Sequence, residues 1–496
     1  MQLKNLILTE GKERKTPSLL LSAVPVVALL LFIVAILVVF GASSISEYSV
    51  VALCGVSIIA LVLSLCARSL CRRGLILGFR RSARQILPAV PMLVFIAMIS
   101  ATWMLSGVVP VLIDYGLRLL DPRFFLVVAC GVCSVVSVLT GSSWSTIATI
   151  GVAFMGIGSV MGFHPGWVAG AIISGAYFGD KVSPLSDTTV VASSACGVDL
   201  FKHIRYLLLT SVPSLVIAMI VFALAGFFSD TISGGNAAEV RSLLAEHFNM
   251  TPWVLVIPAV TFLLIALRVP TLAVLAVGAA LGLVATFVLQ PQIVATISTG
   301  GVAGTLEAIW QMLWGAVDFH TGSELFDGLV STSGVTGMLS TIALVLSAMI
   351  FGSAMIGTGM LSTLTSSITS RLNSRFALVG STVAGGLFLN SCTADQYLSI
   401  IIGGNMFRNA YRRKGLEARL LSRTLEDSVS VTSVLIPWNS CGVTQSAVLG
   451  VATLVYFPFC VFNYLSPLMS LLMALTGFKI KEHKRAHHTI RIQQAN

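Results

Sequence analysis

Long apolar runs without a charged side chain constrain the fold of this chain more than any other feature. Residues 18–40 and 206–228 are two such runs, and about 20 mostly apolar residues are enough for a helix to cross a membrane. Of the 496 residues, 56% are hydrophobic and only 10% are charged, whereas soluble proteins carry about 25% charged residues. The sequence therefore predicts an all-α polytopic membrane protein.

Basic residues stand in short segments beside the apolar runs, and this pattern predicts the topology. Short cytoplasmic loops of membrane proteins are rich in Lys and Arg, so the net charge of +10 gives no indication of nucleic-acid binding. The segment before residue 18, the arginine-rich loop 68–84 and the tail 479–496 are predicted to be cytoplasmic. We therefore expect a multi-pass protein of the cytoplasmic (inner) membrane with both termini in the cytoplasm.

A polar stretch, GDKVSPLSDTT, interrupts the apolar pattern at residues 179–189. Proline removes a backbone donor and disfavours helix in the residue before it, so Pro184 is expected to break a helix over residues 167–198. In lipid, irregular backbone is tolerated only where it is buried in protein or lines a wet cavity. Charged residues at such a break indicate an ion or substrate path. A short polar loop at the membrane surface is the alternative.

The segment 124–154 is long for one span and has a polar centre at residues 140–149. This pattern favours a re-entrant hairpin with the polar centre as its tip.

The second half of the chain repeats the pattern of the first. Starting from Arg123 and Arg375, the halves align without a gap, and the polar tips coincide. The string SACGV at residues 194–198 is matched to SCGV at residues 440–443.

Loop charges indicate that the two repeats are inverted. Loop 68–84 is rich in Arg, whereas loop 318–333 has no basic residue. Loop 156–166 has no basic residue, whereas loop 408–423 is rich in them. Each loop is therefore predicted to lie on the opposite side of the membrane from its counterpart in the other half. This predicts two inverted repeats related by an axis in the membrane plane.

Each repeat is expected to hold about five transmembrane helices and one re-entrant hairpin, with broken helices at the midplane. The predicted organisation is an N-terminal repeat 1–228 with hairpin 124–154 and broken helix 167–198, an external linker 229–251, a C-terminal inverted repeat 252–478 and a cytoplasmic basic tail 479–496.

Five carboxylates are predicted to lie at membrane depth, in the hairpin tips and broken segments. Each would cost about 2.5–3.5 kcal/mol at a helix centre, so together they indicate cation or proton coupling. The alternative is pairing with Lys181 or Arg423 to fasten loops, most readily for Glu426. The five are Asp180, Asp187, Asp395, Glu426 and Asp427.

Hydroxyl, amide and indole groups accompany these carboxylates. Hard oxygen donors suit a small hard cation, so we expect an Na+ site at Asp187 and Asp395. Asp187 is the first choice because hydroxyls flank it, and Asp180 is second because the adjacent Lys181 is available to neutralise it. The predicted substrate- or ion-binding residues are Ser142, Ser143, Thr146, Ser183, Ser186, Thr188, Thr189, Asn390, Ser391, Thr393, Trp438, Asn439 and Ser440.

Four motifs resemble those of the NhaC-type Na+/H+ antiporter family, which includes exchangers of malate, lactate and sodium. They are GSSWSTIATIGVAFMGI, GAYFGDKVSPLSDTT, ADQYLSIIIGGNMFRNAY and SRTLEDSVSVTSVLIPWNSCGV. The resemblance covers about the whole chain. It implies an ion-transporter fold with inverted repeats and sodium-coupled exchange.

The predicted function is Na+/H+ antiport by alternating access, with Na+ and H+ as transported ions and no cofactor. A Na+-coupled exchanger or symporter of a small organic acid or amino acid is the alternative. An intramembrane enzyme is disfavoured because no Ser–His pair is predicted at membrane depth. Expected partners are small ions, an organic anion under the alternative, and the lipid bilayer; a homodimer is left open.

Overall fold

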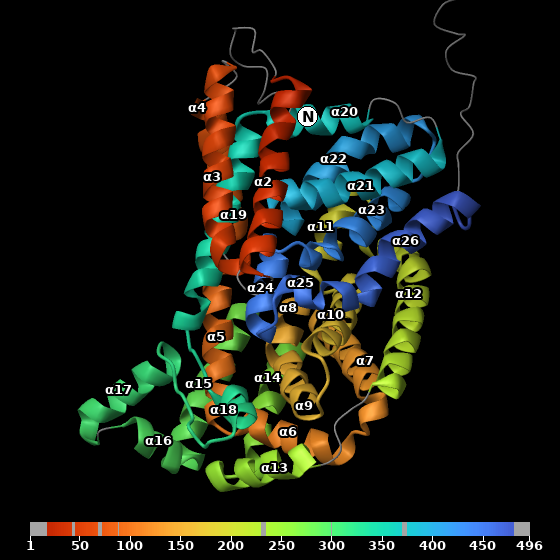
Figure 1. The fold of residues 1–496 in the computed structure, drawn as a ribbon. Coiled ribbons are helices and arrows are strands. Elements are labelled where there is room, and N and C mark those ends of the chain that lie inside the picture. Colours follow the sequence, from red (N-terminus) through yellow and green to blue (C-terminus); the bar gives the residue numbers. More distant parts are fainter. Residues whose placement is uncertain are drawn as a thin grey trace, which may run out of the picture.

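The computed structural model shows an all-helical chain (Figure 1). Within the described residues, the only β feature is an isolated antiparallel bridge between Val317 and Thr332. The segment before residue 17 and the tail beyond residue 480 lie outside the described residues, so the predictions made for them are untested. The structure describes residues 17–41, 45–67, 72–87, 89–229, 235–298, 300–369 and 374–480.

Helices of the first half follow one another through short connections. They are α2 (Leu19–Phe40), α3 (Ile45–Cys66), α4 (Arg72–Ile86), α5 (Ala89–Leu105), α6 (Val108–Leu119), α7 (Pro122–Thr140), α8 (Ser143–Thr146), the π-helical segment η1 (Ile147–Gly151), α9 (Val152–Val160), α10 (Pro165–Val182), α11 (Asp187–Cys196), α12 (Leu200–Phe228) and α13 (Gly235–His247).

The second half is helical in the same manner. Its elements are η2 (Pro252–Leu255), α14 (Val256–Ala266), α15 (Thr271–Leu289), α16 (Pro291–Ile297), α17 (Gly301–Leu313), α18 (Glu324–Val330), η3 (Thr336–Met338), α19 (Leu339–Gly357), α20 (Met360–Thr369), α21 (Arg375–Thr393), α22 (Gln396–Arg413), α23 (Ala418–Leu425), the π-helical segment η4 (Glu426–Ser430), η5 (Ser433–Leu435), α24 (Ser440–Leu449), α25 (Thr453–Tyr456), η6 (Phe457–Phe459) and α26 (Val461–Thr476).

The prediction of an all-α multi-pass protein is confirmed. Eight helices of the described part are long and apolar enough to cross a membrane, and the number rises to 12 if each bent helix pair is one span. The apolar runs at residues 18–40 and 206–228 form α2 and α12. Leu20 on α2 and Phe228 on α12 are each 83% exposed, as expected of helices that face lipid.

Both polar interruptions are confirmed as helix breaks. Segment 124–154 is a helical hairpin with its tip at Gly141 and Ser142, between the ends of α7 and α8. Each arm has the length and composition of a membrane span on its own, so the re-entrant path stays a prediction. The second interruption separates α10 from α11, with Pro184 between them.

The second half places its breaks at matching positions. α21 and α22 meet at Ala394 and Asp395, as α7 and α8 meet at their tip, and a break before α24 corresponds to the break before α11. This recurrence supports a repeat, whereas its inversion stays a prediction. Residues with left-handed backbone form three pairs with the same spacing between the halves, namely Gly141 and Ala394, Gly162 and Gly415, and Gly197 and Gly450. This spacing is one residue longer than that between Arg123 and Arg375, so the gapless sequence alignment is one residue out of register.

The motif match between residues 194–198 and 440–443 is wrong. Gly197 is the C-cap of α11, whereas Ser440 is the first residue of α24. The same spacing between the halves instead pairs Ser440 with Asp187, the first residue of α11. Two short strings rich in Ser, Cys and Gly had coincided without structural equivalence.

Two stretches predicted as a loop and a linker contain helices. α4 occupies most of the predicted loop 68–84, and its Gly78 lies against the backbone of Ser353 in α19. α13 occupies the middle of the predicted linker 229–251, and Val240 and Leu244 on it are buried. Tertiary packing of an apolar face stabilises helices of this length.

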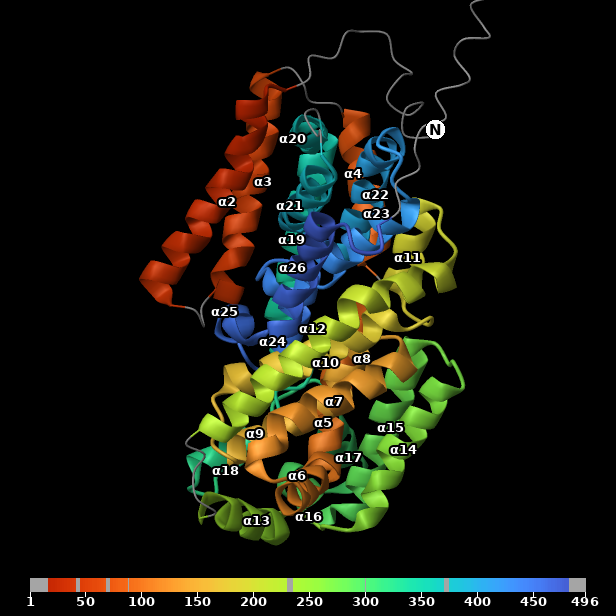
Figure 2. The same ribbon diagram turned by 90° about the vertical axis from the view of Figure 1, so that its right-hand side faces the viewer.

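Close packing of α10 on α7 positions the first break. A Cβ atom at Gly175 would lie 2.1 Å from the carbonyl oxygen of Cys130, and one at Gly179 would lie 2.4 Å from that of Ser134. Small residues spaced four apart allow two membrane helices to approach this closely. Figure 2 shows α7, α10 and α12 side by side. Asp180 follows Gly179 directly, so this contact fixes its place.

Candidate ion-binding site

The first hairpin tip docks on the first break, and Asp180 lies at the junction. Asp180 Oδ2 accepts hydrogen bonds from the Ser143 backbone N–H at 3.1 Å and from Ser143 Oγ at 2.7 Å. Asp180 Oδ1 accepts one from Ser186 Oγ at 2.5 Å. Ser143 is the first residue of α8 and Ser186 is the N-cap of α11. Two helix starts therefore converge on one carboxylate.

Asp187 is exposed, and its carboxylate has no hydrogen-bond or ion partner within the described part of the chain. Its neighbouring hydroxyls face other groups, since Ser186 binds Asp180 and Thr189 Oγ1 donates to the Lys181 carbonyl at 3.0 Å. The expectation that hydroxyls surround Asp187 is therefore wrong, because they gather at Asp180.

A cavity of about 620 Å³ opens beside both carboxylates. Of the predicted residues, Ser142, Asp180, Asp187 and Thr188 line this cavity, and Trp144 forms part of its wall. The cavity therefore joins the tip of the first hairpin to both ends of the first break.

Several polar residues in the cavity wall were missed by the sequence reasoning, and Arg268, Gln396 and Tyr397 are the largest of them. Arg268 lies in the connection between α14 and α15, where it is exposed and has a left-handed backbone with φ of 62°. Gln396 and Tyr397 begin α22 and bring the second hairpin to the first break. A left-handed conformation is uncommon for a residue other than glycine.

Two further predicted residues of the first half fasten the backbone and do not line this cavity. Thr146 Oγ1 donates to the Ser142 carbonyl at 2.9 Å, and Ser183 Oγ donates to the Val138 carbonyl at 2.7 Å.

The second hairpin tip docks on the second break. The Ser440 backbone N–H donates to the Ala394 carbonyl at 2.9 Å, and Asn439 Nδ2 donates to the Asn390 carbonyl at 3.2 Å. Trp438 Nε1 donates to the Ser391 carbonyl at 2.9 Å. The predicted residues thus come together here, but mainly as contacts between the tip and the break.

Asp395 is the N-cap of α22 and is only 3% exposed. Its Oδ1 accepts a hydrogen bond from the Leu398 backbone N–H at 2.8 Å. Thr393 Oγ1 donates to the Asp395 carbonyl at 2.9 Å. Asp395 is absent from the wall of the large cavity, so a shared site with Asp187 stays a prediction that these contacts do not support.

A buried ion pair joins the two halves of the chain. Lys181 on α10 binds Asp427 on η4, and the side chains of both are almost completely buried. The adjacent Asp180 is therefore not neutralised by Lys181, contrary to the expectation. Asp427 also accepts hydrogen bonds from Thr210, Ser466 and Ser470, and lies 3.8 Å from Arg423 Nε.

Glu426 is fully buried, and neither of its carboxyl oxygens has a hydrogen-bond partner among the described residues. The expectation that Glu426 would most readily pair with Lys181 or Arg423 is wrong, because Asp427 contacts both cations.

The arrangement around Asp180 has the chemistry of a site for a small hard cation. A carboxylate, two hydroxyls and a second carboxylate at the cavity wall supply hard oxygen donors. A hydroxyl that donates to a carboxylate can also rotate to offer a lone pair to a cation. Within the described residues, no group of three or more His, Cys, Asp and Glu side chains is placed to hold a metal ion.

The chain is similar to known ion antiporters over most of its length. A profile of the Na+/H+ antiporter family matches residues 8–199 and 175–478. The chain is 38% identical over 398 residues to the Na(+)/H(+) antiporter NhaC of Alkalihalophilus pseudofirmus, which covers 80% of this chain and 83% of that protein.

Two other relatives have different transported molecules in their names. The malate-2H(+)/Na(+)-lactate antiporter of Bacillus subtilis is 34% identical over 394 residues, or 79% of this chain and 81% of that protein. The arginine/ornithine antiporter ArcD of Halobacterium salinarum is 34% identical over 409 residues, or 81% of each chain. The chain therefore belongs to the Na+/H+ antiporter family and is a multi-pass secondary antiporter of the NhaC type, not an enzyme.

Proposed function

We propose that this protein exchanges Na+ for H+ across the membrane, with Asp180 as the principal carboxylate and Asp187 as its companion at the cavity wall. The observation that carries the proposal is the pair of hydroxyl contacts to Asp180, at 2.7 Å from Ser143 and 2.5 Å from Ser186. These groups are presented at a helix break beside a cavity, where irregular backbone and charge are tolerated in a membrane.

Exchange follows if one carboxylate holds either ion. In the proton-loaded state the carboxyl group retains the Ser143 and Ser186 contacts. In the sodium-loaded state the same hydroxyl oxygens and the ionised carboxylate surround Na+. Alternating access then exposes the loaded site to one side at a time.

Flux in proteoliposomes tests this function. We expect an outward-directed proton gradient to drive uptake of radioactive sodium, and the apparent affinity for Na+ to fall as the pH is lowered, because protons compete for the same carboxylate. Initial rates across a range of pH values measure this competition. An affinity for Na+ that stays constant over the whole pH range would contradict a shared site.

Arg268 favours a second candidate, the sodium-coupled exchange of an organic anion. A cavity of about 620 Å³ falls within the range of small-molecule sites, about 300–1,000 Å³, and is larger than Na+ requires. The guanidinium group binds carboxylates in a bidentate manner. In the same vesicles, labelled malate and lactate test whether an organic anion is exchanged. Arg268→Gln would abolish that anion flux and spare Na+/H+ exchange, whereas equal loss of both fluxes would count against an anion role.

We also propose that the two halves are inverted repeats with both termini in the cytoplasm. His164 and Lys414 lie in the turns that precede α10 and α23, and both are exposed. A membrane-impermeant thiol reagent is expected to label His164→Cys from outside and Lys414→Cys only from inside, relative to the parent chain. Labelling of both positions from one face would rule out the inversion.

A further inference from the structure

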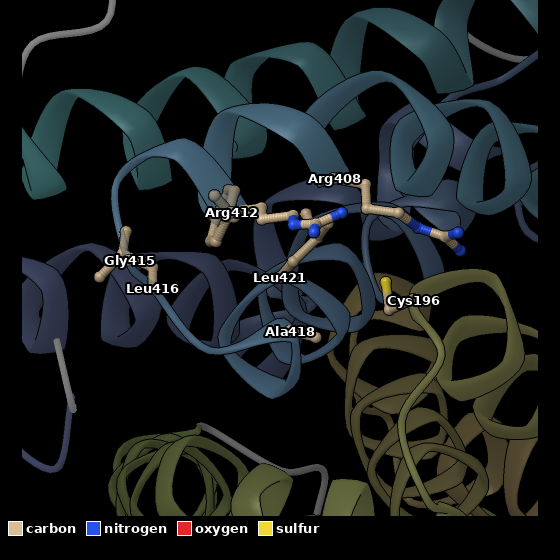
Figure 3. A pocket seen from close by; sticks show the side chains of 8 residues that line it. Cys196, Arg408, Arg412, Gly415, Leu416, Ala418 and Leu421 are labelled. Atoms are coloured by element: carbon tan, nitrogen blue, oxygen red, sulfur yellow. The ribbon is translucent and has the colours of Figure 1, made fainter. Parts of the chain in front are cut away.

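A second cavity lies at the other end of α11 from Asp187. Its volume is about 340 Å³, and it lies between the last turn of α11 and the connection from α22 to α23 (Figure 3). Arg408 and Arg412 on α22, Cys196 on α11 and Leu421 on α23 are among its lining residues. None of the residues lining it lines the larger cavity.

The basic wall of this cavity consists of two arginines one helical turn apart. In Figure 3, Arg408 and Arg412 extend in the same direction above Cys196. Arg412 is exposed, and its guanidinium group has no hydrogen-bond or ion partner in the described part of the chain, while Arg408 Nη2 donates to the Ala195 carbonyl. The nearby Glu417 pairs with Arg419. No carboxylate lines the cavity, so its polar side presents positive charge.

The remaining wall is largely apolar. The exposed Ala418 and the edge of Leu416, which is 6% exposed, face the opening, while Leu421 and the ring of Tyr411 form the buried floor. The cavity therefore combines two guanidinium groups with an aliphatic surface. A ligand that satisfies both sides must be an amphiphile with an anionic head.

We propose that this cavity binds the phosphate group of an anionic phospholipid, with the start of an acyl chain against Leu416 and Ala418. Paired guanidinium groups bind phosphate through charge-assisted, bidentate hydrogen bonds. Basic pockets at the ends of membrane helices are suited to anionic headgroups. α22 ends at Arg413 and is followed by Lys414, so the cavity lies where basic side chains gather at a helix end.

The bound lipid would touch the half-helix that carries Asp187. Arg408 contacts Ala195 in the last turn of α11, and Asp187 is the first residue of that helix. A headgroup competes with the Ala195 carbonyl for the Arg408 guanidinium group. Occupancy of the cavity is therefore expected to change how firmly the end of α11 is held.

Native mass spectrometry of the purified chain in detergent tests the site without any transport measurement. With added phosphatidylglycerol, the wild type is expected to retain one bound molecule in preference to phosphatidylcholine. The double variant Arg408→Gln, Arg412→Gln should weaken this binding by roughly tenfold or more, because it removes both charged contacts. Arg413→Gln removes the same charge from the adjacent residue, which does not line the cavity, and should bind as the wild type does.

A second variant separates the cavity from general surface charge. Ala418 is exposed and lines the cavity, so Ala418→Trp fills the space while leaving both arginines in place, and should also lose the bound lipid. Retention of phosphatidylglycerol by Ala418→Trp, or equal loss in Arg413→Gln, overturns the proposal. Displacement of the lipid by an equal concentration of inorganic phosphate would assign the site to a soluble anion and overturn the lipid assignment.

Discussion

Asp180→Asn is expected to reduce Na+/H+ exchange by about 100-fold or more. The substitution preserves the size and one oxygen donor, but it removes the charge to which Ser143 and Ser186 donate. A hydrogen bond to a charged group contributes about 1.5–3 kcal/mol, the substitution weakens two such bonds, and each 1.4 kcal/mol is about a factor of ten. Uptake of radioactive sodium into proteoliposomes under a proton gradient measures the loss.

Two matched variants accompany this measurement. Asp199→Asn makes the same chemical change at the exposed N-cap of α12, where asparagine also caps well, and should exchange at the wild-type rate. Asp187→Asn should retain exchange with a weaker affinity for Na+, because Asp187 has no hydroxyl contacts in the described structure. Abolished exchange in Asp187→Asn with normal exchange in Asp180→Asn would reverse this ranking in favour of the sequence expectation.

The positions of the helix breaks were predictable because local chemistry determines them. Pro184 cannot continue α10, and in segment 124–154 Gly141, with a left-handed φ of 68°, ends α7 while the Ser142 side chain caps α8. Both effects act within a few residues, so the sequence is sufficient to locate them. The same holds for α2 and α12, whose apolar length alone indicates a membrane helix.

The contacts of the individual carboxylates were not predictable from their neighbours in the chain. Successive residues of a helix point about 100° apart, so residues one apart do not face each other. Lys181 therefore reaches Asp427, 246 residues away, and leaves Asp180 to the hydroxyls. Ser186 likewise serves Asp180 and not the adjacent Asp187.

Charge patterns located polar segments without defining their structure. The arginines of loop 68–84 indicated a side of the membrane, but a charged segment can still be a helix if one face packs, as α4 does at Gly78 against α19. Arg268 stands in a short connection between apolar runs, and nothing in the neighbouring sequence indicates that it belongs to a binding site. Only the three-dimensional arrangement places it in the same cavity wall as Asp180.

Lys181→Met is expected to lower the free energy of unfolding by about 3–5 kcal/mol. The substitution leaves the Asp427 carboxylate buried without the cation that contacts it most closely, and an uncompensated buried charge is strongly destabilising. Arg423, at 3.8 Å, compensates only in part. Unfolding of the purified chain in detergent measures the change, and Lys202→Met, which removes an exposed lysine at the start of α12, is the matched control.

The double variant Lys181→Met, Asp427→Asn decides whether charge or packing causes this loss. Methionine fills the space of the Lys181 side chain with a flexible apolar chain, although it loses the ammonium group that lies 5.6 Å from the Phe462 ring centroid. Asparagine can still accept hydrogen bonds from Ser466 and Thr210. Neither substituted side chain is then an unpaired charge, but the buried Arg423 loses its nearest carboxylate, so we expect part of the lost stability to return and not all of it. Residues in direct contact show such non-additivity, whereas independent ones do not. If the double variant instead loses as much stability as the two single variants together, Lys181 stabilises the contact between the halves by its shape. The ion pair itself would then contribute nothing.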